Sequence, residues 1–143
     1  MDLLLDTNVF LWWEASSSRL NNRAARLLPD EGNRVFVSVA SIWEITIRRR
    51  VRKLAFEGSV TDALIASGFL DIPVLGADAE MAGNLEWDHN DPFDRLIVSQ
   101  AINRGLTLVT ADSEIRRYAG VAVLSAGLSG PGIAYRPGGA ASS

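Results

Sequence analysis

Near its N-terminus the chain reads Leu3-Leu4-Leu5-Asp6-Thr7-Asn8, and this stretch gives the clearest indication of the fold. Its three leucines form a short apolar run that predicts a buried strand, and the polar residues after them predict a turn or the cap of a helix. In open α/β sheets, ligands bind in the crevice beyond the carboxyl ends of the strands. Asp6 lies where such a strand would end, so it is the first candidate for a functional residue.

Further strands and helices alternate along the chain. Short runs rich in apolar or β-branched residues predict strands at residues 35–37, 71–74, 106–110 and 121–124, and Pro73 places the second of these at an edge of the sheet. Helical spacing of apolar residues lies between them, at residues 9–14, 19–28, 57–69, 77–85 and 94–104, and in a helix capped by Ser38 that runs into residues 48–53. Strands separated by helices require crossover connections. The sequence therefore predicts an α/β domain with a central, mostly parallel sheet flanked by helices on both faces.

The chain has 143 residues, which is enough for one globular domain and too few for two. Residues 1–126 carry the whole pattern of strands and helices and form the predicted domain. Residues 127–143 are rich in glycine and proline, a composition that predicts a loosely ordered tail.

Composition excludes several kinds of site. The chain has no cysteine, which excludes disulfides, thiolate zinc sites and a cysteine nucleophile. Its one histidine, His89, excludes metal sites built from several histidines, and neither a P-loop nor a nucleophile-elbow motif is present. Catalysis would then rest on carboxylates. No signal peptide or membrane-spanning run is found, and we expect a soluble, cytoplasmic protein.

Four acids have positions that suit such a role. Asp6 and Asp112 follow predicted strands, whereas Glu44 and Asp94 lie in strongly apolar helices, where a buried carboxylate is costly unless positive charge compensates it. Converging acids favour Mg²⁺ or Mn²⁺, because both ions prefer oxygen ligands, and an ion held in this way can support phosphodiester hydrolysis. Acids at strand ends also occur in receiver domains, in phosphatases of the haloacid-dehalogenase type and in structural ion pairs, so spacing alone leaves these open.

Four motifs follow one another along the chain: Leu-Leu-Leu-Asp-Thr-Asn (3–8), Ser-Ile-Trp-Glu-Ile (41–45), His-Asn-Asp-Pro-Phe-Asp-Arg-Leu-Ile (89–97) and Leu-Val-Thr-Ala-Asp (108–112). Their order and spacing resemble those of the PIN-domain ribonucleases. Over about residues 1–125 the chain looks like a VapC-type toxin of a bacterial toxin–antitoxin pair.

This resemblance implies a PIN-like fold and a function. It implies that the catalytic carboxylates, which bind Mg²⁺ or Mn²⁺, are Asp6, Glu44, Asp94 and Asp112. It further implies cleavage of RNA, a homodimer, and inhibition by a small VapB-type antitoxin that inserts a peptide near the active site.

Each acid also has an ordinary structural interpretation. Asp6 and Asp94 could cap helices, Glu44 could be a solvent-facing helix residue, and Asp112 could belong to a turn. Asp91 competes with Asp94 for the role of ligand. We favour Asp94, because it shares a face with the apolar residues that follow it at helical spacing, and we expect Asp91 to shape the turn before the helix.

The polar neighbours of these acids have two interpretations as well. Thr7, Asn8 and Thr110 would either orient ligands and water near the acids or cap the backbone. His89 is expected to be a structural hydrogen-bonding residue of its loop, and a role as general base is the alternative.

Aromatic and basic residues complete the candidates. Most of the four tryptophans are expected to pack in the core or in a dimer interface, and stacking on RNA bases is the alternative; they are Trp12, Trp13, Trp43 and Trp87. The basic run Arg48 to Lys53 is either an edge that contacts phosphates or a solvated helix end.

The leading hypothesis is a metal-dependent endoribonuclease that acts as a toxin. The alternatives are a non-catalytic PIN-like module that binds RNA or protein, a housekeeping RNA-processing nuclease, and a magnesium-dependent phosphatase or receiver domain. Phosphatases and receivers of this kind need a well-placed lysine, and the only lysine is Lys53, in the basic run. The net charge of -3 leaves RNA binding open, because residues 1–53 carry nine basic and six acidic side chains and residues 54–143 carry five and eleven.

Overall fold

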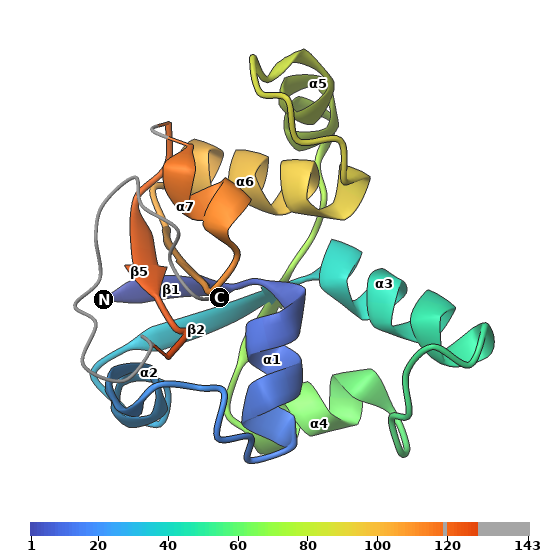
Figure 1. Ribbon diagram of the computed structural model, residues 1–143, viewed down its shortest axis with the longest axis vertical. Coiled ribbons are helices and arrows are strands. Elements are labelled where there is room, and N and C mark those ends of the chain that lie inside the picture. The colour runs from blue at the N-terminus through green and yellow to red at the C-terminus, as the bar shows by residue number, and fades with distance from the viewer. Residues whose placement is uncertain (119, 129–143) are drawn as a thin grey trace.

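A computed structural model describes residues 1–118 and 120–128 (Figure 1). Within these residues the chain forms one sheet of five parallel strands in the order β3-β2-β1-β4-β5. The strands are β1 (Asp2–Leu5), β2 (Arg34–Ser38), β3 (Leu70–Ile72), β4 (Thr107–Thr110) and β5 (Val123–Ser125). The predicted parallel sheet is confirmed, and β3 lies at an edge, as Pro73 predicts.

Seven helices in the described part connect and cover the strands. They are α1 (Thr7–Glu14), α2 (Asn22–Leu27), α3 (Val39–Arg50), α4 (Val60–Ala66), α5 (Gly76–Asn84), α6 (Pro92–Arg104) and α7 (Ser113–Arg117). In Figure 1, α1, α2 and α4 lie below the sheet and α6 and α7 lie above it, with α5 beyond α6. Helices thus flank both faces, which confirms the predicted fold class.

The three leucines of β1 contribute to both cores of the domain. Leu3 and Leu5 join the core that α1, α2 and α4 cover, whereas Leu4 joins the core beneath α6 and α7. Successive side chains of a strand point to opposite faces, so a strand that is covered on both faces is apolar at every position. All three leucines are 0% exposed. The unbroken apolar run therefore corresponds to the central strand of the sheet.

Two helices begin two residues earlier than helical spacing predicts, because aspartates cap them. α1 begins at Thr7, since the Asp6 side chain accepts a hydrogen bond from the Val9 N–H. α6 begins at Pro92, since the Asp91 side chain accepts hydrogen bonds from the first turn. Each helix is therefore preceded directly by an acidic residue, Asp6 before α1 and Asp91 before α6.

Other elements also differ from the prediction. Helical spacing does not predict α7, which has five residues and is capped by Asp112. α4 is shorter than predicted, because it begins only after its cap Ser59 and the chain leaves it near Gly68, whose φ is 76°. α2 is likewise shorter than the helix predicted over residues 19–28. Residues 129–143 of the predicted tail lie outside the described residues.

A buried carboxylate holds α5 against α6. The side chain of Asp78 is 2% exposed, and Arg104 donates to both of its oxygens at 3.0 Å. Asn103 donates at 2.9 Å, and the Leu75 N–H at the start of α5 donates at 2.8 Å. Burial alone would raise the pKa of Asp78, but these donors lower it to about 2.

We expect Asp78→Asn to lower the free energy of unfolding by about 2 kcal/mol at pH 7, because Arg104 would lose its charged partner. The folded-state pKa of Asp78 lies below the ordinary value of 3.8. The stabilisation is therefore full above about pH 4 and is lost as the pH falls towards 2. Urea unfolding at pH 7 and at pH 3 measures the effect, which should be smaller at pH 3.

The control for this substitution is Asp2→Asn, which removes an exposed ion pair with Arg34. We expect no measurable change in unfolding from it. An equal loss of stability for Asp78→Asn at both pH values would contradict the role of its charge.

Candidate metal centre

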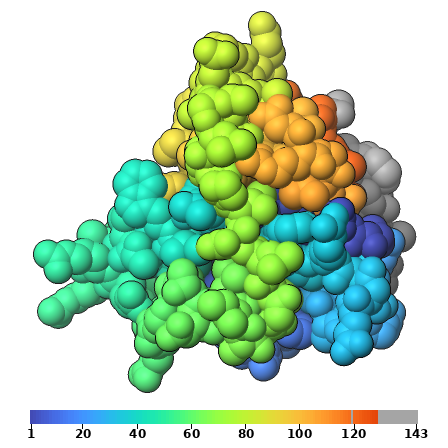
Figure 2. Space-filling view, turned by 180° about the vertical axis from the view of Figure 1, so that it is seen from behind, coloured from blue at the N-terminus to red at the C-terminus, as the bar shows by residue number. Residues whose placement is uncertain are grey.

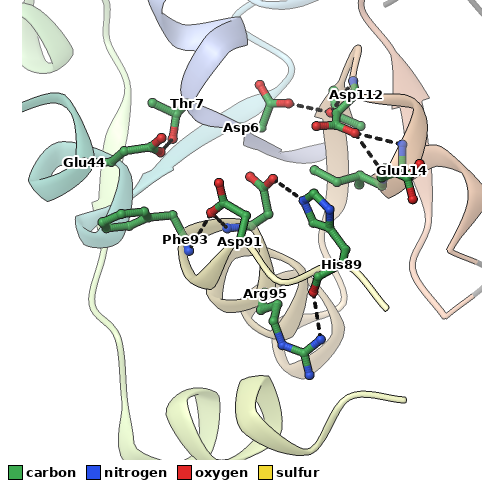
Figure 3. A network of polar contacts seen from close by, with 12 residues as sticks. Asp6, Thr7, Glu44, His89, Asp91, Phe93, Arg95, Asp112 and Glu114 are labelled. Carbon is green, nitrogen blue, oxygen red and sulfur yellow. Dashed lines mark hydrogen bonds and ion pairs between the residues drawn. The ribbon is translucent and has the colours of Figure 1, made fainter. Parts of the chain in front are cut away.

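The four predicted acids lie around one pocket of about 230 Å³ at the carboxyl ends of the strands. Asp6 directly follows β1 and Asp112 comes two residues after β4, the strand beside it. Glu44 lies in α3 and Asp94 lies in the first turn of α6. Figure 3 shows Glu44 and Asp112 on opposite sides of this space, with Asp6 between them. The structure thus brings together all four residues that the sequence singles out.

Asp6 is the most deeply buried of these acids, at 5% exposed. Its Oδ1 accepts a hydrogen bond from the Val9 N–H at 2.8 Å, and its Oδ2 accepts one from the Thr110 hydroxyl. Burial nevertheless raises the pKa of Asp6 to about 7, and the charges of Asp94 and Asp112 add to the rise. The residue is therefore both a helix cap and a buried carboxylate whose hydrogen bonds do not offset the cost of burying its charge.

Thr110 connects the two acids at the strand ends. Its hydroxyl donates to Asp6 and accepts a hydrogen bond from the Asp112 N–H at 3.0 Å. The Asp112 side chain in turn accepts from the Glu114 N–H at 2.8 Å. The structure therefore supports both interpretations of Thr110, which orients the Asp6 carboxylate and caps the backbone N–H of Asp112.

Glu44 is oriented from α1. The Thr7 hydroxyl donates to its Oε1 at 2.6 Å, and the same hydroxyl lies 2.9 Å from the Ser41 hydroxyl. Burial raises the pKa of Glu44, the Thr7 hydrogen bond and the charge of Arg48 oppose the rise, and the charge of Asp91 adds to it. The side chain is half-buried and lines the pocket rather than facing open solvent.

Asp94 and Asp91 divide two roles between them. Asp91 caps α6 by accepting from the Phe93 N–H at 2.9 Å and the Asp94 N–H at 3.1 Å, as expected of a residue that shapes the turn. The Asp94 side chain instead lies 2.7 Å from the imidazole of His89. Burial raises the pKa of Asp94 to about 6, with the charges of Asp91 and Asp112 adding to the rise and the His89 hydrogen bond opposing it. Asp91 also lines the pocket.

Helix N-termini add positive potential around these acids. α1 begins beside Asp6 and α6 begins beside Asp91 and Asp94. The unpaired N–H groups of a first helical turn carry partial positive charge, which favours nearby anions.

His89 and Arg95 are the two residues whose roles sequence reasoning missed. His89 was expected to be a structural residue of its loop, with a role as general base as the alternative, and the structure places its Nε2 2.7 Å from the Asp94 carboxylate. Arg95 donates to four backbone carbonyls of the segment before α6, at 2.8 to 3.0 Å; they belong to Ala82, Leu85, Trp87 and His89. Arg95 therefore holds the loop that presents His89. Their closeness to Asp94 in the sequence was the only available signal.

The basic run at the end of α3 divides into residues with different surroundings. Arg48 lines the acidic pocket. Arg49 donates to the carbonyls of Phe56 and Gly58 at 3.2 and 2.7 Å and holds the next loop. The rest of the run is exposed, and in Figure 2 the teal and green segment that contains it stands out from the body of the domain. Arg48 is thus the member of the run best placed to meet a substrate at the pocket.

Three of the four tryptophans pack against a core, as expected for most of them. Trp12 and Trp13 pack against one core and Trp87 packs against the other. Trp43 does not pack in a core, because it is 61% exposed and makes an edge contact with Phe93 at 5.6 Å between ring centroids. Its ring lies on the outer face of α3.

A larger groove adjoins the acidic pocket. It has a volume of about 540 Å³ and shares Asn8 and Arg48 with the pocket. Its apolar lining includes Leu11, Trp12 and Phe56.

No helix among the described residues is both long enough and apolar enough to cross a membrane.

Comparisons with known proteins agree with this arrangement. A family model described as "PIN domain" matches residues 3–121. A curated relative, Ribonuclease VapC22 of Mycobacterium tuberculosis, is 28% identical over 119 residues, which are 81% of this chain and 91% of the relative.

Solved structures share the fold at lower identity. A chain of VapBC2 from Rickettsia felis, bound to a DNA fragment from their promoter, has a TM-score of 0.65 at 21% identity, and the match covers 88% of this chain and 99% of that one. A chain of the toxin–antitoxin system VapBC-5 from Mycobacterium tuberculosis has a TM-score of 0.55 at 19% identity, covering 89% and 98%.

We expect Asp6→Asn to stabilise the metal-free protein at pH 8. The folded-state pKa of Asp6, about 7, lies above the ordinary value of 3.8, so ionised Asp6 lowers the free energy of unfolding at high pH. The gain should be on the order of 2 to 4 kcal/mol at pH 8 and should narrow as the pH falls through 7 towards 4. Urea unfolding in the presence of a chelator measures it.

The exposed loop acid Asp88 provides the control, as Asp88→Asn should leave stability at pH 8 unchanged. If Asp6→Asn were less stable than the wild-type protein at pH 8, the burial of an uncompensated charge would be the wrong explanation.

Proposed function

The chain belongs to the PIN-domain family, and from this membership we propose that it is a metal-dependent endoribonuclease, the toxin of a toxin–antitoxin pair. The observation that carries the proposal is the convergence of four carboxylates from β1, α3, α6 and the turn before α7 on one pocket. One of them, Asp6, is buried with a pKa near neutrality, which is the state of a group that a cation would stabilise.

The residues present fit a hard divalent cation. We assign its binding to the carboxylate oxygens of Asp6, Glu44, Asp94 and Asp112, which are the donors that Mg²⁺ and Mn²⁺ prefer. Nucleases of this family generally depend on a divalent cation. Such a cation, when bound, activates water and stabilises negative charge on the phosphoryl group.

The chain itself holds the carboxylates ready for this task. Thr110 fixes Asp6 relative to Asp112, and Thr7 fixes Glu44. Side chains oriented in advance need little rearrangement when the substrate binds, and this lowers the activation barrier. Arg48 brings positive charge to the same pocket and would attract a phosphate of the RNA strand.

The relatives support the identity of the partner. The curated relative is named a ribonuclease, and the solved neighbours are VapBC complexes. We propose a VapB-type antitoxin as the partner in the cytoplasm. The apolar groove that meets the pocket at Asn8 and Arg48 offers a route by which a segment of that antitoxin could approach the acids.

The outer face of α3 supports a homodimer. Four exposed apolar side chains follow one another at intervals of four residues along this helix and just past its end, with exposed fractions of 37 to 61%; they are Val39, Trp43, Ile47 and Val51. Residues four apart lie on the same face of a helix. An apolar row of this kind is typical of a surface that another chain covers.

Two alternatives would share this fold. A non-catalytic module would have no need for four converging acids, and it is therefore disfavoured. A housekeeping nuclease would have the same centre, and it differs from a toxin in its effect on growth: induced synthesis of a toxin stops growth, and synthesis of its antitoxin restores it.

We expect Asp94→Asn to lower RNA cleavage at least 100-fold in Mg²⁺ or Mn²⁺ and to abolish growth inhibition, while the fold is kept. The reason is the loss of one charged ligand from the centre. Cleavage of labelled single-stranded RNA by the purified protein measures the effect, and circular dichroism checks the fold. Asp62→Asn, on the outer side of α4, should keep full activity. Normal cleavage by Asp94→Asn would remove this residue from the centre.

We expect Arg48→Ala to raise the KM for RNA about tenfold with a smaller change in kcat, because Arg48 lines the acidic pocket and would contact a substrate phosphate. The slope of the logarithm of affinity against the logarithm of salt concentration should fall by about one. Arg50→Ala is the matched control on the same helix, where the side chain is exposed. Equal effects of the two substitutions would indicate attraction by overall charge instead of a specific contact.

A further inference from the structure

His89 faces the centre with a nitrogen atom. Its Nε2 lies 2.7 Å from Asp94 Oδ2. One ligand atom from each of His89, Asp94 and Asp112 lies within 4.8 Å of the other two. The side chains of His89 and Asp94 are 19% and 18% exposed, so both are largely shielded from solvent. Figure 3 shows the imidazole between its loop and the carboxylates.

Contacts that do not involve Asp94 also hold this imidazole in place. Its ring lies against Trp87 at 4.8 Å between centroids, and Trp87 stacks on Tyr118 at 5.0 Å. Arg95 donates to the carbonyls of His89 and Trp87 at 3.0 and 2.8 Å. The position of the nitrogen is thus set by an aromatic stack on one side and by a backbone clamp on the other.

The distances suit coordination of one ion. Neighbouring ligand atoms at about 2.1 Å from a cation lie about 3 Å apart, and opposite ones lie a little over 4 Å apart. The separation of 2.7 Å between Nε2 and Oδ2 would have to open by only a few tenths of an ångström. In the absence of a cation, the hydrogen bond between these two atoms keeps both of them at the site.

We propose that His89 is a nitrogen ligand of the divalent cation, together with Asp94 and Asp112, and that the centre therefore binds Mn²⁺ in preference to Mg²⁺. Mg²⁺ binds almost entirely through oxygen, whereas Mn²⁺ and the later transition metals accept imidazole. This inference rests on the proposed function, since it requires that the carboxylates bind a cation at all.

Pulsed electron paramagnetic resonance of the Mn²⁺-loaded full-length protein tests the inference directly. We expect the magnetic coupling of an imidazole ¹⁴N to Mn²⁺ in the wild-type protein and its loss in His89→Ala and His89→Gln. Asn90→Ala, which changes the exposed next residue, should keep the coupling. Mn²⁺ bound without nitrogen coupling in the wild-type protein would overturn the inference.

Calorimetric titration separates a ligand from a residue that only positions Asp94. We expect His89→Ala and His89→Gln to lower Mn²⁺ affinity at least tenfold each and Mg²⁺ affinity less than threefold. A glutamine amide can still donate to Asp94, so recovery of Mn²⁺ affinity in His89→Gln would overturn the inference and leave His89 a positioning residue. Equal losses for both ions would overturn it too.

The same titration distinguishes a failure of the metal centre from a failure of the proposed role of His89. If the wild-type protein bound neither ion, the metal centre of the proposed function would fail, and the role of His89 would fail with it. If it bound Mn²⁺ and His89→Ala bound it equally well, only the role of His89 would fail. Thermal melting of each variant shows that it is folded before its affinity is compared.

Discussion

The burial of the Asp6 carboxylate is the constraint on which the rest of the site depends. This side chain ends the central strand, caps α1 and accepts the Thr110 hydroxyl, and it is 5% exposed. Both of its oxygens are therefore hydrogen-bonded, yet its pKa remains near 7, because hydrogen bonds do not replace the hydration that a negative charge loses on burial. Only further positive charge, beyond that of Arg48 in the same pocket, would compensate fully. A site arranged in this way lowers stability in the absence of a cation and gains stability when one binds.

Hydroxyl groups and one imidazole hold the acidic side chains in their orientations around the pocket. Thr7 orients Glu44, Thr110 orients Asp6 and Asp112, and His89 contacts Asp94. The neutral hydroxyls hold carboxylates in place without neutralising them, which leaves their charge for a cation. His89 differs from them, because burial opposes its charge but the hydrogen bond to Asp94 and the nearby carboxylates raise its pKa. Arg95 acts one step further out, since it holds the backbone of the loop that carries His89. Rigidity around the pocket thus comes both from Thr7, which lines it, and from side chains behind it such as Arg95.

The surface around the acidic pocket carries the charge and the apolar groups that a substrate or partner would meet. Uncompensated, the acidic pocket would repel a polyanion such as RNA. Basic side chains near it lie in the last turn of α3, whose end stands out from the domain in Figure 2. Arg48 lies at the boundary between the acidic pocket and the apolar groove. The two surfaces are therefore continuous, so that a partner lying in the groove would reach the position that a substrate phosphate would occupy.

Most of the fold followed from local sequence, because a strand buried on both faces must be apolar throughout and a helix on its surface must repeat its apolar residues at helical spacing. The first residues of two helices were predicted less accurately from the sequence. Asp6 and Asp91 cap α1 and α6, and each helix therefore begins two residues before its apolar spacing does. The acids could be named from the sequence for the same local reason, since each stands at a strand end or on an apolar helix face. The contacts of His89 with Asp94, of Thr110 with Asp6, and the different surroundings of Arg48 and Arg49 depended on packing. The contact of Thr110 with Asp6 joins residues far apart in the chain and forms only when β1 and β4 lie side by side in the sheet. The contact of His89 with Asp94 is close in sequence, but its geometry depends on the loop that Arg95 holds, which no spacing along the chain encodes.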